Sequence, residues 1–145
     1  MTGWLLDTNV LSELIRAEPN PAVVVFVERA VPAFVSVVSL HELRFGVERL
    51  PEGQRQDDLR GWLLSLEATH RNTIIAVGLR EADTAARLRA TAARGGKTVH
   101  IADGLLAGTA AEHDLVIATR NTADFDGLGV RVANPWRQDP RTQPP

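Results

Sequence analysis

The chain has 145 residues, 44% of them apolar and 23% charged, and a formal net charge of −2. A chain of this length suffices for one domain that buries roughly two-thirds of its unfolded surface, and the composition excludes a disordered or fibrous protein. There is no cysteine, which excludes disulfides, thiolate metal sites and thiol nucleophiles, and the negative charge argues against nucleic-acid binding through bulk positive charge.

Nothing at the start of the chain predicts export or membrane insertion. The opening sequence MTGWLLDTNV has no basic segment of the kind that begins a signal peptide. The longest apolar runs, such as 22–27, are far shorter than the ~18 residues that a membrane-spanning helix needs. We therefore expect a cytoplasmic protein without a membrane segment, in keeping with the absence of cysteine.

Short apolar runs alternate along the chain with segments whose apolar residues recur at helical spacing. In chain order, we predict a strand at 4–6, helices at 10–15 and 21–29, a strand at 33–38, helices at 40–50 and 57–69, a strand at 73–77, helices at 80–94 and 101–110, and strands at 115–118 and 130–132. Ser39 and Glu42 have the spacing of a capping box at the start of the helix at 40–50. This order predicts an α/β fold with a mainly parallel sheet, in a single domain at 1–136 followed by a loose tail at 137–145.

Four acidic residues are candidates for one shared site at an edge of this sheet. Asp7 directly follows the first strand, Glu42 lies in the first turn of the helix after the second, and Asp124 lies in the loop after the fourth. In open parallel sheets, ligands bind beyond the carboxyl ends of the strands. Asp103 lies in the first turn of the helix that leads into the fourth strand, so chain order alone does not place it at that edge.

A group of carboxylates without histidine or cysteine favours a hard divalent cation such as Mg²⁺ or Mn²⁺. Such an ion binds phosphate oxygens while it keeps several waters, activates a water molecule and offsets charge on phosphorus during in-line attack. The residues alone therefore predict a metal site that acts on phosphate.

Taken singly, each acid also has a simpler structural interpretation. Asp7 has the position of a helix N-cap, and Glu42 that of a capping-box partner. Asp103 complements a helix dipole, and Asp124 has the setting of an Asx turn. The arrangement of all four in a parallel α/β order is what favours a metal site over these interpretations.

Four segments of the chain resemble the PIN-domain ribonucleases of bacterial toxin–antitoxin systems, of the VapC and FitB kind. They are LLDTNVLSEL at 5–14, SVVSLHELRFGVERL at 36–50, HIADGLLAGTAAEHDLVIATRNTADF at 100–125 and VANPW at 132–136. The combination of DTNVLSEL, ELRFG and TRNTADF is specific, whereas DTN alone is weak. The resemblance runs through nearly the whole chain.

The resemblance implies a Rossmann-like three-layer α/β/α fold and a Mg²⁺-dependent ribonuclease in which Mn²⁺ is able to replace Mg²⁺. It further implies an RNA substrate, a homodimer and inhibition by a small antitoxin of the VapB or FitA type. The implied catalytic and metal-binding quartet is Asp7, Glu42, Asp103 and Asp124, with Asn9, Thr119 and Asn121 as supporting polar residues. This chain departs from the family at Gly104, where alanine is more common; the glycine costs up to about 1 kcal/mol of helix propensity but leaves the carboxylate in place.

Several other residues are weaker candidates. Arg44 and Arg120, and less specifically Arg131 and Arg137, flank the proposed site and are candidates for RNA phosphate contacts, although each is also a typical solvated surface residue. His100 lies three residues before Asp103, on the same predicted helix face. Trp4, Trp62 and Trp136 are candidates for base stacking, with core packing favoured for the first two.

Two rival functions stay open at this point. A metal-dependent phosphohydrolase with Asp7 as nucleophile would usually have a second acid two residues on, where this chain has Asn9. A non-catalytic PIN-like module that binds RNA or protein would be expected to lack one or more of the four acids. Two motif fragments do not extend to full motifs: HEx2H fails at Phe45, and the P-loop ending at Lys97 lacks its first glycine at Thr91.

Overall fold

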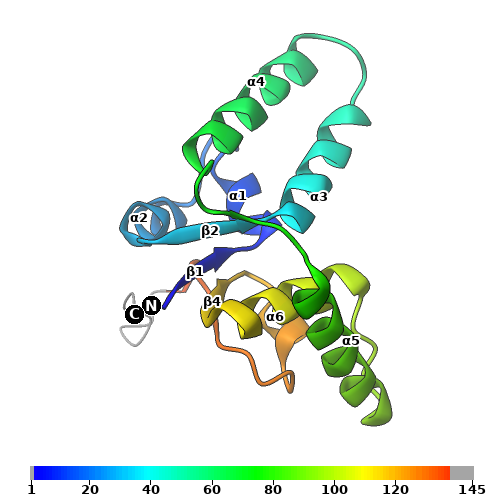
Figure 1. Ribbon diagram of the computed structural model, residues 1–145. Coiled ribbons are helices and arrows are strands. Elements are labelled where there is room, and N and C mark those ends of the chain that lie inside the picture. Colours follow the sequence, from blue (N-terminus) through cyan, green and yellow to red (C-terminus); the bar gives the residue numbers. More distant parts are fainter. Residues whose placement is uncertain (1, 138–145) are drawn as a thin grey trace.

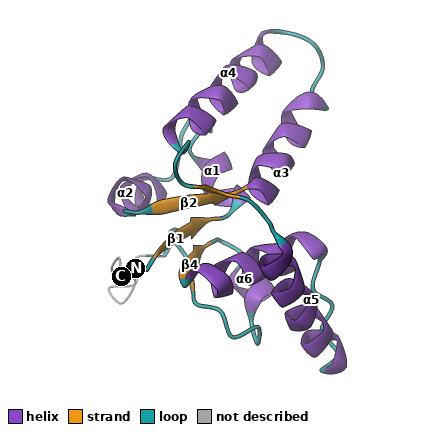
Figure 2. Cartoon of the chain, in the orientation of Figure 1, coloured by secondary structure: helices purple, strands orange, loops and turns teal. Residues whose placement is uncertain are grey.

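The computed structural model describes residues 2–137, which form a single five-stranded sheet with helices on both faces (Figures 1 and 2). The strands are β1 Gly3–Leu6, β2 Ala33–Ser36, β3 Ile74–Ile75, β4 Leu115–Ala118 and β5 Val132–Ala133. They lie in the order β3-β2-β1-β4-β5, and all neighbouring pairs are parallel. The predicted α/β class with a mainly parallel sheet is confirmed, and the described sheet is parallel throughout.

The helices divide between the two faces of the sheet. They are α1 Thr8–Glu13, α2 Pro21–Arg29, α3 Val37–Glu48, α4 Gln54–Thr69, α5 Leu79–Arg94, α6 Ile101–His113 and the short 3-10 helix η1 Thr122–Phe125. Figure 2 shows α1 to α4 on one side of the strands and α5 and α6 on the other. None of the helices within residues 2–137 combines the length and apolar character that crossing a bilayer requires.

Successive side chains of β1 belong alternately to two hydrophobic cores, one on each face of the sheet. Trp4 and Leu6 pack with α1 to α4, and Trp4 meets Phe26 edge to face at a centroid distance of 4.8 Å. Leu5 points to the opposite face and packs with residues of α6. Because successive strand side chains point to opposite faces, three consecutive apolar residues require helices on both sides. This produces the predicted three-layer α/β/α arrangement.

The junction between β2 and α3 differs from the predicted one. The strand ends at Ser36 and the helix begins at Val37, because the Ser36 hydroxyl oxygen accepts the Val38 N–H at 3.1 Å and caps the helix. The capping box predicted for Ser39 and Glu42 is therefore wrong, since Ser39 lies fully buried inside the helix. Two consecutive valines favour a strand by propensity, but the cap at Ser36 ends it.

Two other predicted boundaries shift. The last strand, predicted at 130–132, is β5 at Val132–Ala133, and the predicted helix at 57–69 begins earlier, at Gln54. The loose tail predicted at 137–145 lies, apart from Arg137, outside the described residues.

Close packing between α5 and α6 depends on two glycines of α6. A Cβ on Gly108 would lie 2.5 Å from the carbonyl oxygen of Glu81 and 2.8 Å from the backbone nitrogen of Ala85. A Cβ on Gly104 would lie 2.5 Å from Cδ of Arg89, whose Nε donates to the carbonyl oxygen of Val99 at 2.9 Å. The unusual glycine after Asp103 therefore makes room for an arginine that holds the segment leading into α6.

Candidate active site

Asp7 lies at the point where the strand order reverses, between β1 and β4. Its backbone N–H donates to the carbonyl oxygen of Ala118 at 3.0 Å, so the residue after β1 sits beside the residue after β4. In an open α/β sheet, this reversal leaves a crevice beyond the carboxyl ends of the strands, where ligands bind. Asp7 is also the N-cap of α1, as its simpler interpretation predicted.

The Asp7 carboxylate is only 6% exposed and is held by three donors. Its Oδ1 accepts the Thr8 N–H at 2.7 Å, and its Oδ2 accepts the Thr119 hydroxyl at 2.8 Å and the Asn9 amide at 3.3 Å. Burial raises the pKa of Asp7 above its usual value, the Thr119 hydrogen bond opposes this rise, and the nearby charge of Asp124 adds to it. A charged carboxylate is thus kept in a fixed orientation at a cost in free energy.

Two of the three predicted supporting residues, Thr119 and Asn9, bind Asp7, whereas Asn121 contacts Thr119 through its backbone. Thr119 is fully buried; besides donating to Asp7, it accepts the Asn9 amide at 3.1 Å and the Asn121 backbone N–H at 3.0 Å. Asn9 in turn accepts the Arg120 backbone N–H at 3.1 Å. The side chain of Asn121 makes no hydrogen bond to any part of residues 2–137, so the structure gives it only a backbone contact.

Thr8 links Asp7 to Glu42, and the sequence analysis did not single it out. Its hydroxyl donates to Oε1 of Glu42 at 3.2 Å, while its backbone N–H binds Asp7. Glu42 is exposed and lies in the second turn of α3, not in the first, because the helix starts at Val37. The signal for Thr8 is its place between two candidate polar residues in the DTN segment.

Asp103, whose place chain order had left undecided, is within electrostatic range of the other three acids. It is in the first turn of α6, as predicted, and its pKa is raised from 3.8 to about 6. Burial is the largest cause, followed by the negative charges of Asp124, Asp7 and Glu42, while the charge of His100 opposes the rise. The negative charges of the other three acids therefore reach Asp103.

Asp124 is presented by η1, and Lys97 holds that short helix in place. Phe125 is 2% exposed and anchors η1 in the core beneath, which leaves the preceding Asp124 side chain exposed. The Lys97 ammonium donates to the carbonyl oxygens of Ala123 at 2.9 Å and Asp126 at 2.7 Å. Lys97 is the only lysine of the chain, and no sequence signal connected it with these carbonyls.

Substituting Lys97 by methionine is expected to loosen the loop that carries Asp124. Loss of two charge-assisted hydrogen bonds from a half-buried ammonium should lower the free energy of unfolding by about 1 kcal/mol. Removing a group that orients a ligand should weaken Mn²⁺ binding, measured by titration calorimetry, about 10-fold. Lys97→Arg, which keeps charge and donors, should recover part of both losses; equal affinities in all three proteins would contradict this role.

The four carboxylates suit a hard divalent cation by their chemistry. They offer oxygen ligands, and their negative charges repel one another. At Asp7 and Asp103, burial further disfavours the charged form. A divalent cation offsets such repulsion and prefers such ligands. Across residues 2–137, however, no three acidic or histidine side chains stand close enough to share one ion as they are oriented. The acids influence one another electrostatically, and Thr8 binds both Asp7 and Glu42. Their role as metal ligands stays a prediction.

Asp103→Asn is expected to stabilise the protein when no metal is bound. Since the pKa of Asp103 in the folded state, about 6, lies above its usual 3.8, its contribution to stability falls as the pH rises from about 4 to 6 and stays unfavourable above that. At pH 7.5 in EDTA, the substitution should raise stability by about 1 to 2 kcal/mol, or Tm by roughly 3 to 6 °C.

The gain should be much smaller at pH 4, where the carboxyl is protonated in the folded state and only partly ionised in the unfolded state, and melting curves at the two pH values measure it. Asp126→Asn is the matched control, because its exposed carboxylate makes no ion pair or hydrogen bond with the described residues. A gain that is equal at both pH values, or equal in the control, would refute repulsion at Asp103.

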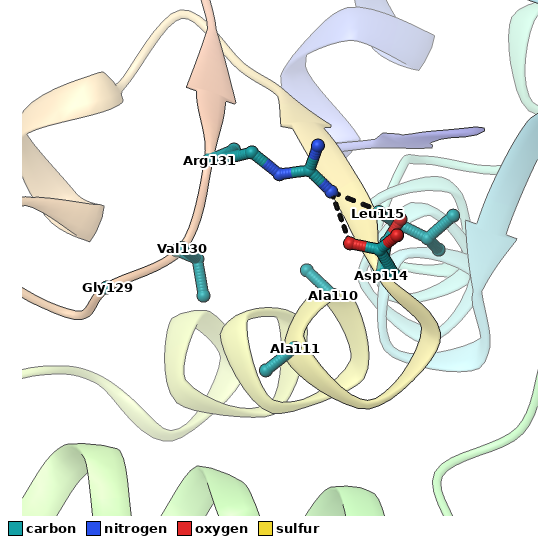
Figure 3. Close-up of a pocket in the computed structure, with 7 residues that line it drawn as sticks. All are labelled: Ala110, Ala111, Asp114, Leu115, Gly129, Val130 and Arg131. Atoms are coloured by element: carbon teal, nitrogen blue, oxygen red, sulfur yellow. Dashed lines mark hydrogen bonds and ion pairs between the residues drawn. The ribbon is translucent and has the colours of Figure 1, made fainter. Parts of the chain in front are cut away.

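Two arginines predicted to flank the site form ion pairs with other residues. The guanidinium of Arg44 is 3.5 Å from Glu48 and 3.6 Å from Glu67, so it joins α3 to α4. Arg131 pairs with Asp114 at 2.6 Å, at the amino end of β4, opposite to the acids, which corrects its predicted place beside them. Figure 3 shows this pair in a pocket of about 220 Å³. The pocket is smaller than usual small-molecule sites, and its two charged groups bind each other.

The three tryptophans lie in different settings. Trp4 lies in the core and Trp62 packs partly buried against it, as predicted. Trp136 is half-buried, packs against the same core and carries the Arg120 guanidinium over its ring at 4.2 Å from the centroid.

The sheet order, the acid at the reversal point and the surrounding polar residues define a known class of protein. Residues 4–129 match the model of the PIN domain. The chain belongs to the PIN-domain family.

Relatives of the VapC and FitB type match over almost the whole length. The chain is 36% identical to "VapC ribonuclease Y4jK" of Sinorhizobium fredii, over 91% of this chain and 96% of the relative. It is also 36% identical to "Toxin FitB" of Neisseria gonorrhoeae, over 91% and 97%. A crystal structure of FitAcB from Neisseria gonorrhoeae superposes with a TM-score of 0.88 at 36% identity, over 92% of this chain and 99% of that one.

Proposed function

We propose that the chain is a Mg²⁺-dependent endoribonuclease that acts as the toxin of a type II toxin–antitoxin system. The observation that carries this proposal is the position of Asp7, whose buried carboxylate lies at the reversal point of a parallel sheet and is linked through Thr8 to Glu42. The ribonuclease and toxin activities are supported by the names of relatives that match over nine-tenths of the chain.

In this proposal, the four acids hold the metal and their neighbours hold the acids. Mg²⁺, or Mn²⁺ in its place, would lower the pKa of a bound water and offset the charge that develops on the phosphate. Asp7 keeps one orientation because Thr119, Asn9 and the Thr8 N–H bind both of its oxygens. Thr8 orients Glu42 as well.

The two rivals are less well supported. A phosphohydrolase with Asp7 as nucleophile would usually have a second acid two residues on, whereas Asn9 at that position is bound to Asp7 and Thr119 as an orienting amide. A binding module without activity would have no use for Asp103, whose raised pKa reflects a cost in folding stability.

Purified protein, freed of any partner, is expected to cleave RNA from a total cellular extract in Mg²⁺ or Mn²⁺. EDTA should stop cleavage, and excess Mg²⁺ should restore it. Sequencing of the new RNA ends would then identify the RNA and the cleavage position. Cleavage that continues in EDTA would refute the metal mechanism, and intact transfer, ribosomal and messenger RNA would refute the ribonuclease.

The proposed partners are an RNA substrate, a second copy of the chain and a small antitoxin of the VapB or FitA type, all in the cytoplasm. Expression of the protein should arrest growth, and co-expression of the adjacent small gene should relieve the arrest. Light scattering should give the mass of a homodimer. Normal growth with soluble protein present would count against a toxin.

A further inference from the structure

Arg120 presents a positive charge at the rim of the candidate site. Its side chain is 51% exposed, and the guanidinium carbon lies over the Trp136 ring, 4.2 Å from the centroid. Stacking of this kind fixes a guanidinium without using any of its N–H donors. The backbone N–H of Arg120 binds Asn9, and the preceding residue Thr119 binds Asp7, so the side chain starts next to the acids.

A buried carboxylate steadies Arg120 from one edge but does not neutralise it. Glu13 is 5% exposed, and its oxygens already accept the Asn20 backbone N–H at 2.9 Å and Arg16 at 3.2 Å. Arg120 approaches the same carboxylate only to 3.9 Å, beyond hydrogen-bond distance. Two arginines therefore share one negative charge, which leaves about one positive charge at this place.

The guanidinium of Arg120 makes no hydrogen bond to residues 2–137, although it is held on two sides. An exposed arginine that is stacked and oriented loses little conformational entropy when it binds an anion, and its N–H groups match phosphate oxygens. The backbone of Arg120 adjoins Thr119 and Asn9, which bind Asp7, and the acids of that edge would repel an RNA backbone. A fixed positive charge at the rim offsets that repulsion.

We infer that Arg120 binds a backbone phosphate of the RNA near the candidate site, and that Trp136 and Glu13 hold its guanidinium in position for this contact. The inference rests on the proposed function, because it names a binding residue for that substrate. Arg120 acts as a binding residue, and Trp136 and Glu13 act as positioning residues.

Binding should be measured by fluorescence anisotropy with a random-sequence 20-nucleotide single-stranded RNA, in an Asp7→Asn background that leaves the RNA intact. Arg120→Ala is expected to weaken binding about 5- to 10-fold and to reduce the slope of log affinity against log salt by about 0.7, the value for one phosphate contact on a single strand. Arg120→Lys should keep the slope but bind less tightly than arginine. Arg87→Ala is the control, because Arg87 carries the same charge and is more exposed, at 79%, but pairs with Asp83 on α5.

Trp136→Leu should weaken RNA binding 2- to 4-fold when Arg120 is present and have no effect in the Arg120→Ala protein, because it acts through the arginine. Melting curves check that each variant is folded, and Arg120→Ala, at an exposed position, serves alone if Trp136→Leu does not fold. In the cleaving protein, Arg120→Ala should raise KM more than it lowers kcat.

An unchanged affinity and salt slope in Arg120→Ala would overturn the inference, as would a loss of kcat alone. If the parent protein fails to cleave RNA at all, the proposed function fails, yet the binding measurements still decide the role of Arg120. Weaker binding without a change of salt slope would instead assign the site to base stacking on Trp136, which also overturns a phosphate contact.

Discussion

Asp7→Asn should lower the rate of RNA cleavage about 100- to 1000-fold while the protein stays folded. The substitution keeps the shape of a side chain that is 6% exposed but removes its negative charge and replaces one acceptor by a donor. Loss of one preorganised charged group in a reaction centre typically has an effect of this size. Initial rates under single-turnover conditions, and Mn²⁺ affinity by calorimetry, measure the two consequences.

The fold should tolerate Asp7→Asn because burial raises the pKa of Asp7, so the folded protein at neutral pH keeps an ionised group that its surroundings disfavour. The asparagine is able to keep its oxygen toward Thr119 and Asn9, so that only the hydrogen bond from the Thr8 N–H is lost. Asp126→Asn is the matched control, with the same change of charge on the loop that carries Asp124, and it should retain the parent rate. An Asp7→Asn rate within 10-fold of the parent would rule out Asp7 as an essential ligand.

Gly108→Ala should be the most destabilising single methyl addition in the helices. The new Cβ would lie 2.5 Å from the carbonyl oxygen of Glu81 and 2.8 Å from the nitrogen of Ala85, both backbone atoms of α5 that are unable to move aside alone. Overpacking against backbone should lower the free energy of unfolding by about 2 to 3 kcal/mol, and Tm by roughly 6 to 9 °C.

The matched control for Gly108→Ala is Gly61→Ala, inside α4, where no atom lies within 4 Å of the added Cβ. There, alanine should raise stability by about 0.5 to 1 kcal/mol, because it favours helix over glycine. Urea denaturation of the three proteins tests both signs. Equal stabilities would mean that α5 and α6 pack less closely than the structure places them.

Local pattern was enough to predict the layers of the fold. Three apolar residues before Asp7 required a strand buried on both faces, and repeated alternation of strands and helices required parallel pairing. The predicted start of α3 was three residues too late, because serine is a good N-cap and both Ser36 and Ser39 were available. Only the backbone conformation distinguishes them: Ser36 is extended and precedes the helix, whereas Ser39 lies within it. Such choices depend on tertiary contacts that propensity does not contain.

In the candidate site, too, some residues were predictable from chain order and others depend on tertiary contacts. Asp7, Glu42 and Asp124 follow strands, so chain order predicted their edge, whereas the place of Asp103 depends on how Arg89 holds Val99 ahead of α6. Lys97 binds carbonyl oxygens 26 and 29 residues away. Backbone carbonyls are the same in every residue, so a contact of this kind leaves no mark in the sequence.

The bonds of Lys97 also determine how this protein should be handled. It carries the only side-chain amine in 145 residues, so reagents that acylate amines have this one side chain to modify. Acylation of Lys97 by dyes, biotin or an amine-reactive sensor surface would remove the charge that holds the Asp124 loop, and the damaged site would then be measured as a weak binder. Attachment through an affinity tag or an introduced surface cysteine leaves the loop intact, and the chain, which has no cysteine of its own, accepts a single thiol label without ambiguity.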